Sequence, residues 1–116
     1  DVHRNTAPLD GVVREVRHIE GKFVPAYRPG MESINERTTL VFGDGDDSVV
    51  VTQIAGILAR RIVCRARPGE SYRQGQEFGL IRFGSANEIV FGEGWEITVA
   101  AGEKVKAGLS VIARRK

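Results

Sequence analysis

Short runs of apolar and β-branched residues, separated by glycine-containing turns, occupy most of the chain. Residues 12–17 alternate in part between apolar and charged side chains, which predicts a strand. Residues 38–42 and 48–54 are rich in Val and Thr, and the Gly-Asp-Gly-Asp turn at 43–46 separates them, so we expect a hairpin. Three further short elements are predicted: a strand at 23–27, one helical turn at 56–60 and a strand at 62–66. The pattern favours an all-β fold.

A seven-residue pattern occurs twice in the C-terminal half of the chain. Residues 69–75 and 102–108 each begin with Gly-Glu, continue with an apolar and then a basic residue, and end with Gly. Glycine at both ends permits the positive φ angles of tight turns, so we expect two pseudo-symmetric β units. The pattern resembles the half-repeats of biotinyl and lipoyl carrier domains, which implies a barrel-sandwich of short strands. Those carriers modify a Lys between the halves, but residues 78–91 contain none.

Length and charge narrow the possible functions. A chain of 116 residues fits a single domain spanning 1–116. The net charge of +2 comes from interspersed charges of both signs, which disfavours nucleic-acid binding. One cysteine, Cys64, excludes an internal disulfide, and two histidines are too few for an obvious metal site, so we expect no metal. Because the chain opens on Asp1 rather than Met, we expect a fragment or a processed product.

The Gly84–Ser85 pair carries the most specific chemistry. It lies between two strand-like apolar runs, 78–83 and 89–91, which would hold a constrained turn firmly. The serine hydroxyl can attack the preceding carbonyl, and glycine suits the first position because no Cβ blocks the approach. The resulting ester can eliminate to dehydroalanine, which hydrolyses to an N-terminal pyruvoyl group. Most Gly-Ser pairs are ordinary turns, so the hypothesis of self-cleavage depends on the two flanking apolar runs.

Several motifs together resemble the phosphatidylserine decarboxylase family in its shorter bacterial and archaeal form. Ile-Arg-Phe-Gly-Ser at 81–85 is similar to the self-cleavage motif of that family. The resemblance covers nearly the whole chain, and its remaining motifs are Asp-Val-His-Arg-Asn-Thr-Ala-Pro at 1–8, Gly-Lys-Phe at 21–23, Asn-Glu-Arg at 35–37, Gln-Ile-Ala-Gly at 53–56 and Ala-Arg-Arg-Ile-Val at 59–63. Each motif is short, but their order is specific.

The resemblance implies a mechanism. Cleavage between Gly84 and Ser85 would give a β chain of residues 1–84 and an α chain of residues 85–116. Ser85 would become a covalent pyruvoyl cofactor. Its ketone would form a Schiff base with the serine headgroup and accept the electrons released with CO₂. The product would be phosphatidylethanolamine. The implied partners are a phospholipid substrate and the cytoplasmic face of the cell membrane, bound peripherally; an assembly of identical chains stays open.

The same resemblance points to residues beside the cleavage site. His3 matches the histidine segment of the family, and an imidazole transfers protons near neutral pH. Asn35, Glu36 and Arg37 are candidates for binding the headgroup, and arginine can contact a carboxylate or phosphate with two donors. A polar loop satisfied by its own hydrogen bonds is the equally weighted alternative. His18 matches no motif and is expected at the surface.

Two other functions remain open from the residues. The chain can be a non-enzymatic carrier-like or lipid-binding β-barrel module, which would stay uncut. It can also be a pyruvoyl-dependent decarboxylase of a soluble amino acid, which would release CO₂ from free serine or tryptophan rather than from a lipid.

Overall fold

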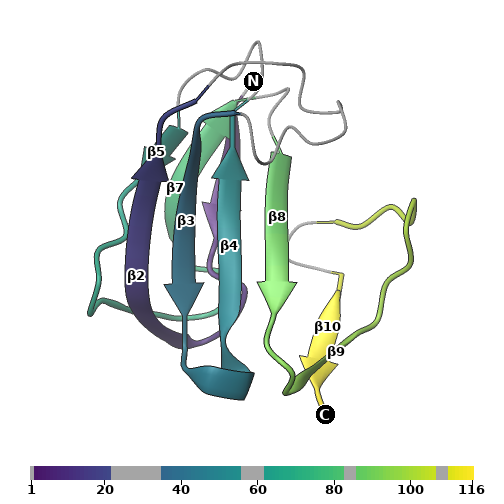
Figure 1. Ribbon diagram of the computed structural model, residues 1–116. Coiled ribbons are helices and arrows are strands. Elements are labelled where there is room, and N and C mark those ends of the chain that lie inside the picture. Colours follow the sequence, from purple (N-terminus) through teal and green to yellow (C-terminus); the bar gives the residue numbers. More distant parts are fainter. Residues whose placement is uncertain (1, 22–34, 56–61, 83–85, 107–109) are drawn as a thin grey trace.

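Short antiparallel strands build the protein (Figure 1). The computed structural model describes residues 2–21, 35–55, 62–82, 86–106 and 110–116. Its elements are β1 (Val2–Thr6), β2 (Gly11–Ile19), β3 (Arg37–Phe42), the 3-10 helix η2 (Gly45–Asp47), β4 (Val49–Ile54), β5 (Ile62–Cys64), β6 (Ser71–Tyr72), β7 (Glu77–Arg82), β8 (Ala86–Phe91), β9 (Trp95–Ile97) and β10 (Ala113–Arg115). The described residues contain no α-helix.

Two facing sheets and a separate hairpin organise these strands. The larger sheet has the order β6-β2-β3-β4-β8, the smaller has the order β1-β7-β5, and β9 pairs with β10. In Figure 1 the smaller sheet lies behind the larger one, and β9–β10 stands beside β8. This arrangement confirms the predicted all-β barrel-sandwich class.

The hairpin predicted from residues 38–54 is present. β3 pairs with β4 in unbroken register from Arg37↔Ile54 to Phe42↔Val49. Gly43 begins the turn with φ of +74°, a conformation that residues with a Cβ rarely adopt. The predicted strand at 12–17 is also present, as the longer β2, because its pairing with β3 continues to Ile19.

The core lies between the two sheets. Leu40 and Phe42 from β3 and Val51 from β4 point inward from the larger sheet, and Phe78 of β7 reaches them from the smaller one. The Phe42 and Phe78 rings meet edge to face, with centroids 6.0 Å apart. Phe78 is therefore a core residue.

The repeated Gly-Glu pattern produces two similar turns in different surroundings. Gly69 and Gly102 both have positive φ, and the Glu70 and Glu103 side chains each accept a hydrogen bond from the backbone N–H three residues earlier. Tyr72 in the first copy is buried, whereas Val105, at the matching position of the second, is 50% exposed. The repeat therefore specifies turns rather than equal burial. Gly108 is outside the described residues, as are the elements predicted at 23–27 and 56–60.

Candidate functional site

Three candidate segments converge at one end of the sandwich. The end of β4, the start of β8 and the N-terminus lie together there, opposite the C-terminus (Figure 1). β7 ends at Arg82 in the smaller sheet, and β8 begins at Ala86 in the larger one. The Gly84–Ser85 bond therefore belongs to a connection between strands of different sheets. Both residues are outside the described part of the chain.

The strand that carries His3 runs alongside the strand that leads to this bond. β1 pairs antiparallel with β7, with Val2 opposite Arg82 and His3 opposite Ile81. The backbone of His3 is thus placed within a few residues of the connection, across one strand spacing. The His3 side chain is not among those described.

The Asn-Glu-Arg motif lies at the start of β3 in the larger sheet, two strands from β8. Arg37 begins β3 opposite Ile54 of β4, and Ile54 is opposite Ala86 of β8. Since neighbouring strands are about 4.8 Å apart, Arg37 lies roughly 10 Å from the first described residue after Ser85. The register therefore brings both predicted groups, His3 and the Asn-Glu-Arg motif, to the same end of the fold.

The three motif residues differ in what their side chains do. Asn35 is fully buried, and its Nδ2 donates to Ala55 O at 2.6 Å. Ala55 N donates to Glu36 O, so the motif is tied to the end of β4. Arg37 donates from one guanidinium nitrogen to Asn35 O at 3.0 Å. Asn35 thus supports the backbone, while Glu36 and Arg37 keep partly exposed side chains. Substrate binding by these three residues stays a prediction.

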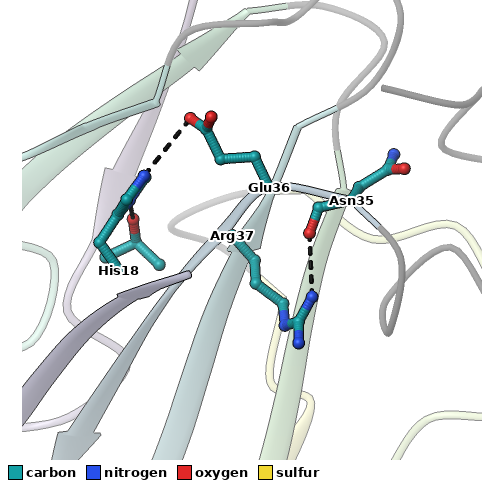
Figure 2. Close-up of polar contacts among 5 residues, drawn as sticks. His18, Asn35, Glu36 and Arg37 are labelled. Carbon is teal, nitrogen blue, oxygen red and sulfur yellow. Dashed lines mark hydrogen bonds and ion pairs between the residues drawn. The ribbon is translucent and has the colours of Figure 1, made fainter. Parts of the chain in front are cut away.

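His18 contacts the motif through one ring nitrogen and the neighbouring Thr38 through the other (Figure 2). Nδ1 lies 2.8 Å from Thr38 Oγ1, and Nε2 lies 3.5 Å from Glu36 Oε2. The side chain is 48% exposed, so its expected surface position is correct. Sequence analysis missed the contact with Glu36, because it depends on the register that places His18 opposite Thr38.

A buried amide pair close to the connection was also missed. Gln53 of β4 is fully buried, and its Nε2 donates to Asn5 Oδ1 of β1 at 2.6 Å. Both residues fall within the motifs quoted above, but 48 positions separate them. Only the packing of one sheet on the other reveals this contact.

The single cysteine is a poor candidate nucleophile. Burial raises the pKa of the Cys64 thiol above its usual value, a backbone hydrogen bond at Ala66 opposes the shift, and the nearby Glu70 carboxylate adds to it. A raised pKa lowers the fraction of thiolate, the reactive form. Among the described side chains, no three His, Cys, Asp or Glu residues cluster as metal ligands do.

Comparison with known proteins decides the family. The model of the family described as phosphatidylserine decarboxylase matches residues 1–113. The chain belongs to the phosphatidylserine decarboxylase family. This confirms the resemblance drawn from the motifs.

Curated relatives of this decarboxylase-family chain are named as proenzymes. A phosphatidylserine decarboxylase proenzyme of Solibacter usitatus is 47% identical over 116 residues, covering 99% of this chain and 56% of that protein. A putative archaetidylserine decarboxylase proenzyme of Methanocaldococcus jannaschii is 40% identical, covering 100% of this chain and 56% of that protein. A phosphatidylserine decarboxylase proenzyme of Nocardia farcinica is 45% identical over 114 residues, covering 97% and 48%.

The phosphatidylserine decarboxylase-like chain spans about half the length of these relatives. No solved structure matches it. Within the described residues, no helix is long and apolar enough to cross a bilayer.

Proposed function

We propose that this chain is the self-processing part of a decarboxylase that removes CO₂ from the serine headgroup of a phospholipid. The observation that carries the proposal is the position of the Gly84–Ser85 bond, between β7 of one sheet and β8 of the other. Strand pairing fixes the described residues on both sides, Arg82 against Val2 and Ala86 against Ile54. Family membership and the proenzyme names of the relatives support it.

Self-cleavage would convert Ser85 into the cofactor. The Ser85 hydroxyl attacks the Gly84 carbonyl, and the peptide bond is replaced by an ester. Elimination then leaves a carboxylate on Gly84 and dehydroalanine at residue 85. Water hydrolyses the dehydroalanine, ammonia leaves, and a pyruvoyl group remains. The sequence fits this group, because Ser85 supplies the hydroxyl and Gly84 before it supplies a carbonyl that no Cβ hinders. When formed, it supplies the electron sink for decarboxylation.

Nearby residues are assigned to proton transfer and substrate binding. His3 is proposed as the acid–base group because β1 carries it alongside the end of β7. Arg37 is proposed to bind the carboxylate or phosphate of the headgroup, since its side chain is partly exposed and, within the described part of the chain, Asn35 O engages one of its donors. Glu36, partly exposed beside His18, is proposed to orient the headgroup amine. Asn35 supports this segment through Ala55.

A phospholipid substrate would require the protein to act at a membrane surface. We propose peripheral association with the cytoplasmic face of the cell membrane. The names of the relatives include both phosphatidylserine and archaetidylserine decarboxylases, so the shared serine headgroup is the chemistry to recognise. Flotation of the complete protein with vesicles of either serine lipid tests this association, and recovery only in the lipid-free fraction would contradict it.

An intact-mass measurement under denaturing conditions tests the central proposal. We expect the complete precursor to divide before residue 85, and the C-terminal product to be lighter by one ammonia than a fragment with N-terminal serine. Ser85→Ala should stay whole, whereas Ser71→Ala, an exposed serine of β6, should be cut normally. A wild-type precursor that stays whole, with no carbonyl reactive toward hydrazine, would refute self-processing.

Two activity measurements test the reaction and the role of His3. We expect CO₂ release from vesicles containing a serine phospholipid and none from free serine or tryptophan. His3→Gln, assayed at equal amounts of cleaved protein, should release CO₂ about 10²–10⁴-fold more slowly. An unchanged rate would remove His3 from the chemistry.

A further inference from the structure

The amide of Gln53 is a polar group inside an apolar core. Gln53 follows Val49 and Val51 on the inward face of β4, and all three are at least 95% buried. Its Nε2 donates to Asn5 Oδ1 at 2.6 Å and approaches Val63 O at 3.4 Å. Its Oε1 is buried and has no hydrogen-bond partner among the residues that the structure describes. One end of this amide is thus well bound, and the other is not.

Packing alone does not account for a glutamine at this position. An unsatisfied buried acceptor costs about 1–3 kcal/mol, and a methionine of similar shape would avoid that cost. Buried polar pairs can instead fix one arrangement of neighbouring elements among several that apolar contacts would allow. The strands that Gln53 holds in place are therefore identified by its contacts.

The Gln53–Asn5 bond joins the two strands that matter for self-cleavage. Asn5 lies two residues after His3 on β1. Gln53 directly precedes Ile54 on β4, which is opposite Ala86 at the start of β8. β1 and β4 belong to different sheets, so this bond ties the His3 strand across the interior to the strand that holds the other side of the cleavage site.

The same amide lies against β7, the strand that enters the cleavage site. Gly79 of β7 is opposite Asn5, and a Cβ at Gly79 would come within 2.9 Å of Gln53 Nε2. The absence of a side chain at Gly79 therefore leaves room for the amide. β1, β4 and β7 meet at this single polar contact.

We infer that Gln53 and Asn5 are positioning residues for self-cleavage, and that their hydrogen bond sets the alignment of β1 and β7 relative to β8. This inference rests on the proposed function. Neither residue is assigned to the chemistry itself. The pair acts by holding His3 and the two flanks of the Gly84–Ser85 bond in one register across the two sheets.

The test separates positioning from stability by removing both polar partners together. Asn5→Leu combined with Gln53→Met replaces the pair with apolar groups of similar size, so no unpaired polar atom is left and thermal stability should stay close to wild type. Self-cleavage of the complete precursor should nevertheless slow at least about tenfold, because a misplacement of about 1 Å can cost about 10²-fold. The rate is followed from synthesis in a cell-free translation reaction.

The matched control removes a second polar pair, one member of which is also on β4. Thr39 and Thr52 hydrogen-bond through their hydroxyls at 3.1 Å, between β3 and β4 and on the other face of β4 from Gln53. Thr39→Val combined with Thr52→Val should leave the cleavage rate within about threefold of wild type. Slow cleavage in the Asn5–Gln53 variant and normal cleavage in this control would support the inference.

Four results would overturn it. Cleavage of the Asn5→Leu, Gln53→Met variant at the wild-type rate would show that the pair is only structural, while the proposed function would stand. Equal slowing in both double variants would show that the effect is general to β4. An uncut wild-type precursor would remove the proposed function and this inference together. If the double variant does not fold, the single variant Gln53→Met is used instead: it removes the donor to Asn5 Oδ1, and cleavage at the wild-type rate in the folded protein would contradict positioning.

Discussion

One added methyl group at Gly79 is expected to push two strands of the smaller sheet apart. A Cβ at this position would lie 2.2 Å from Val63 O and 2.9 Å from Gln53 Nε2. Non-bonded carbon and oxygen atoms approach to roughly 3.3 Å even in close contacts, so the overlap with the carbonyl is about 1 Å. That carbonyl is backbone, and β5 is paired with β7 through Val63↔Leu80, so it has no rotamer by which to withdraw.

The expected loss of stability in Gly79→Ala is large because the Val63 carbonyl cannot move away. Overpacking in a core typically costs about 1–3 kcal/mol, and a clash with paired backbone belongs at the upper end, about 3 kcal/mol. That is a large part of the roughly 5–15 kcal/mol by which proteins are stable. Gly11→Ala is the matched control, because its nearest contacts would be 3.9 Å away and its φ is not positive. We expect it to be neutral or to stabilise by about 0.4–1 kcal/mol.

Urea unfolding of the complete protein, followed by far-ultraviolet circular dichroism, measures both changes. The midpoint of Gly79→Ala should fall with little change in the dependence on urea, since the same surface is exposed on unfolding. If the free energy of unfolding of Gly79→Ala is within about 0.5 kcal/mol of the wild-type value, as is usual for surface substitutions, then the close packing of β5 on β7 is wrong.

Three further predictions concern the core, the thiol and the histidine. Phe42→Ala should lower the free energy of unfolding by about 3–5 kcal/mol in the same assay, because the ring is fully buried. Val111→Ala, at a site 68% exposed, should change it by less than about 0.5 kcal/mol. Equal losses in the two variants would show that Phe42 is not in the core. Because burial raises the pKa of Cys64 and so lowers its thiolate fraction, the thiol should react with iodoacetamide more slowly than free cysteine at pH 8, and its rate should increase as the pH rises through 9. Mass spectrometry measures the rate, and a rate above that of free cysteine would contradict this prediction. His18→Ala should cost less than about 1 kcal/mol, since the ion pair with Glu36 is partly exposed, and a loss of several kcal/mol on urea unfolding would show a stronger contact.

Local features of this fold could be predicted from the sequence. The hairpin of β3 and β4 was predictable because β-branched residues flank a Gly-Asp turn, and Phe78 was predictable as core because it begins an apolar run. The turns at Gly69 and Gly102 were predictable because few other residues tolerate their positive φ. In each case the residues that determine the structure lie within about ten consecutive positions.

The convergence of the candidate site could not be predicted in the same way. His3 is opposite Ile81, and Ile54 is opposite Ala86, through pairings between segments far apart in sequence. A slip of one residue in either register would turn the side chains to the opposite face, and no local pattern fixes that choice. The contact of Gln53 with Asn5 depends on both registers at once, so it could be found only in the assembled sandwich.

The change of sheet between β7 and β8 bears on what the proposed cleavage would leave behind. Six cross-strand pairs with β4 would still anchor β8, and β7 would stay between β1 and β5. The two fragments would remain one folded body and copurify without denaturant. The strands on either side of the cut, β7 and β8, belong to different sheets and do not pair with each other. Self-processing would be a one-way event, because the nitrogen of residue 85 leaves as ammonia and no amine remains to re-form the peptide bond.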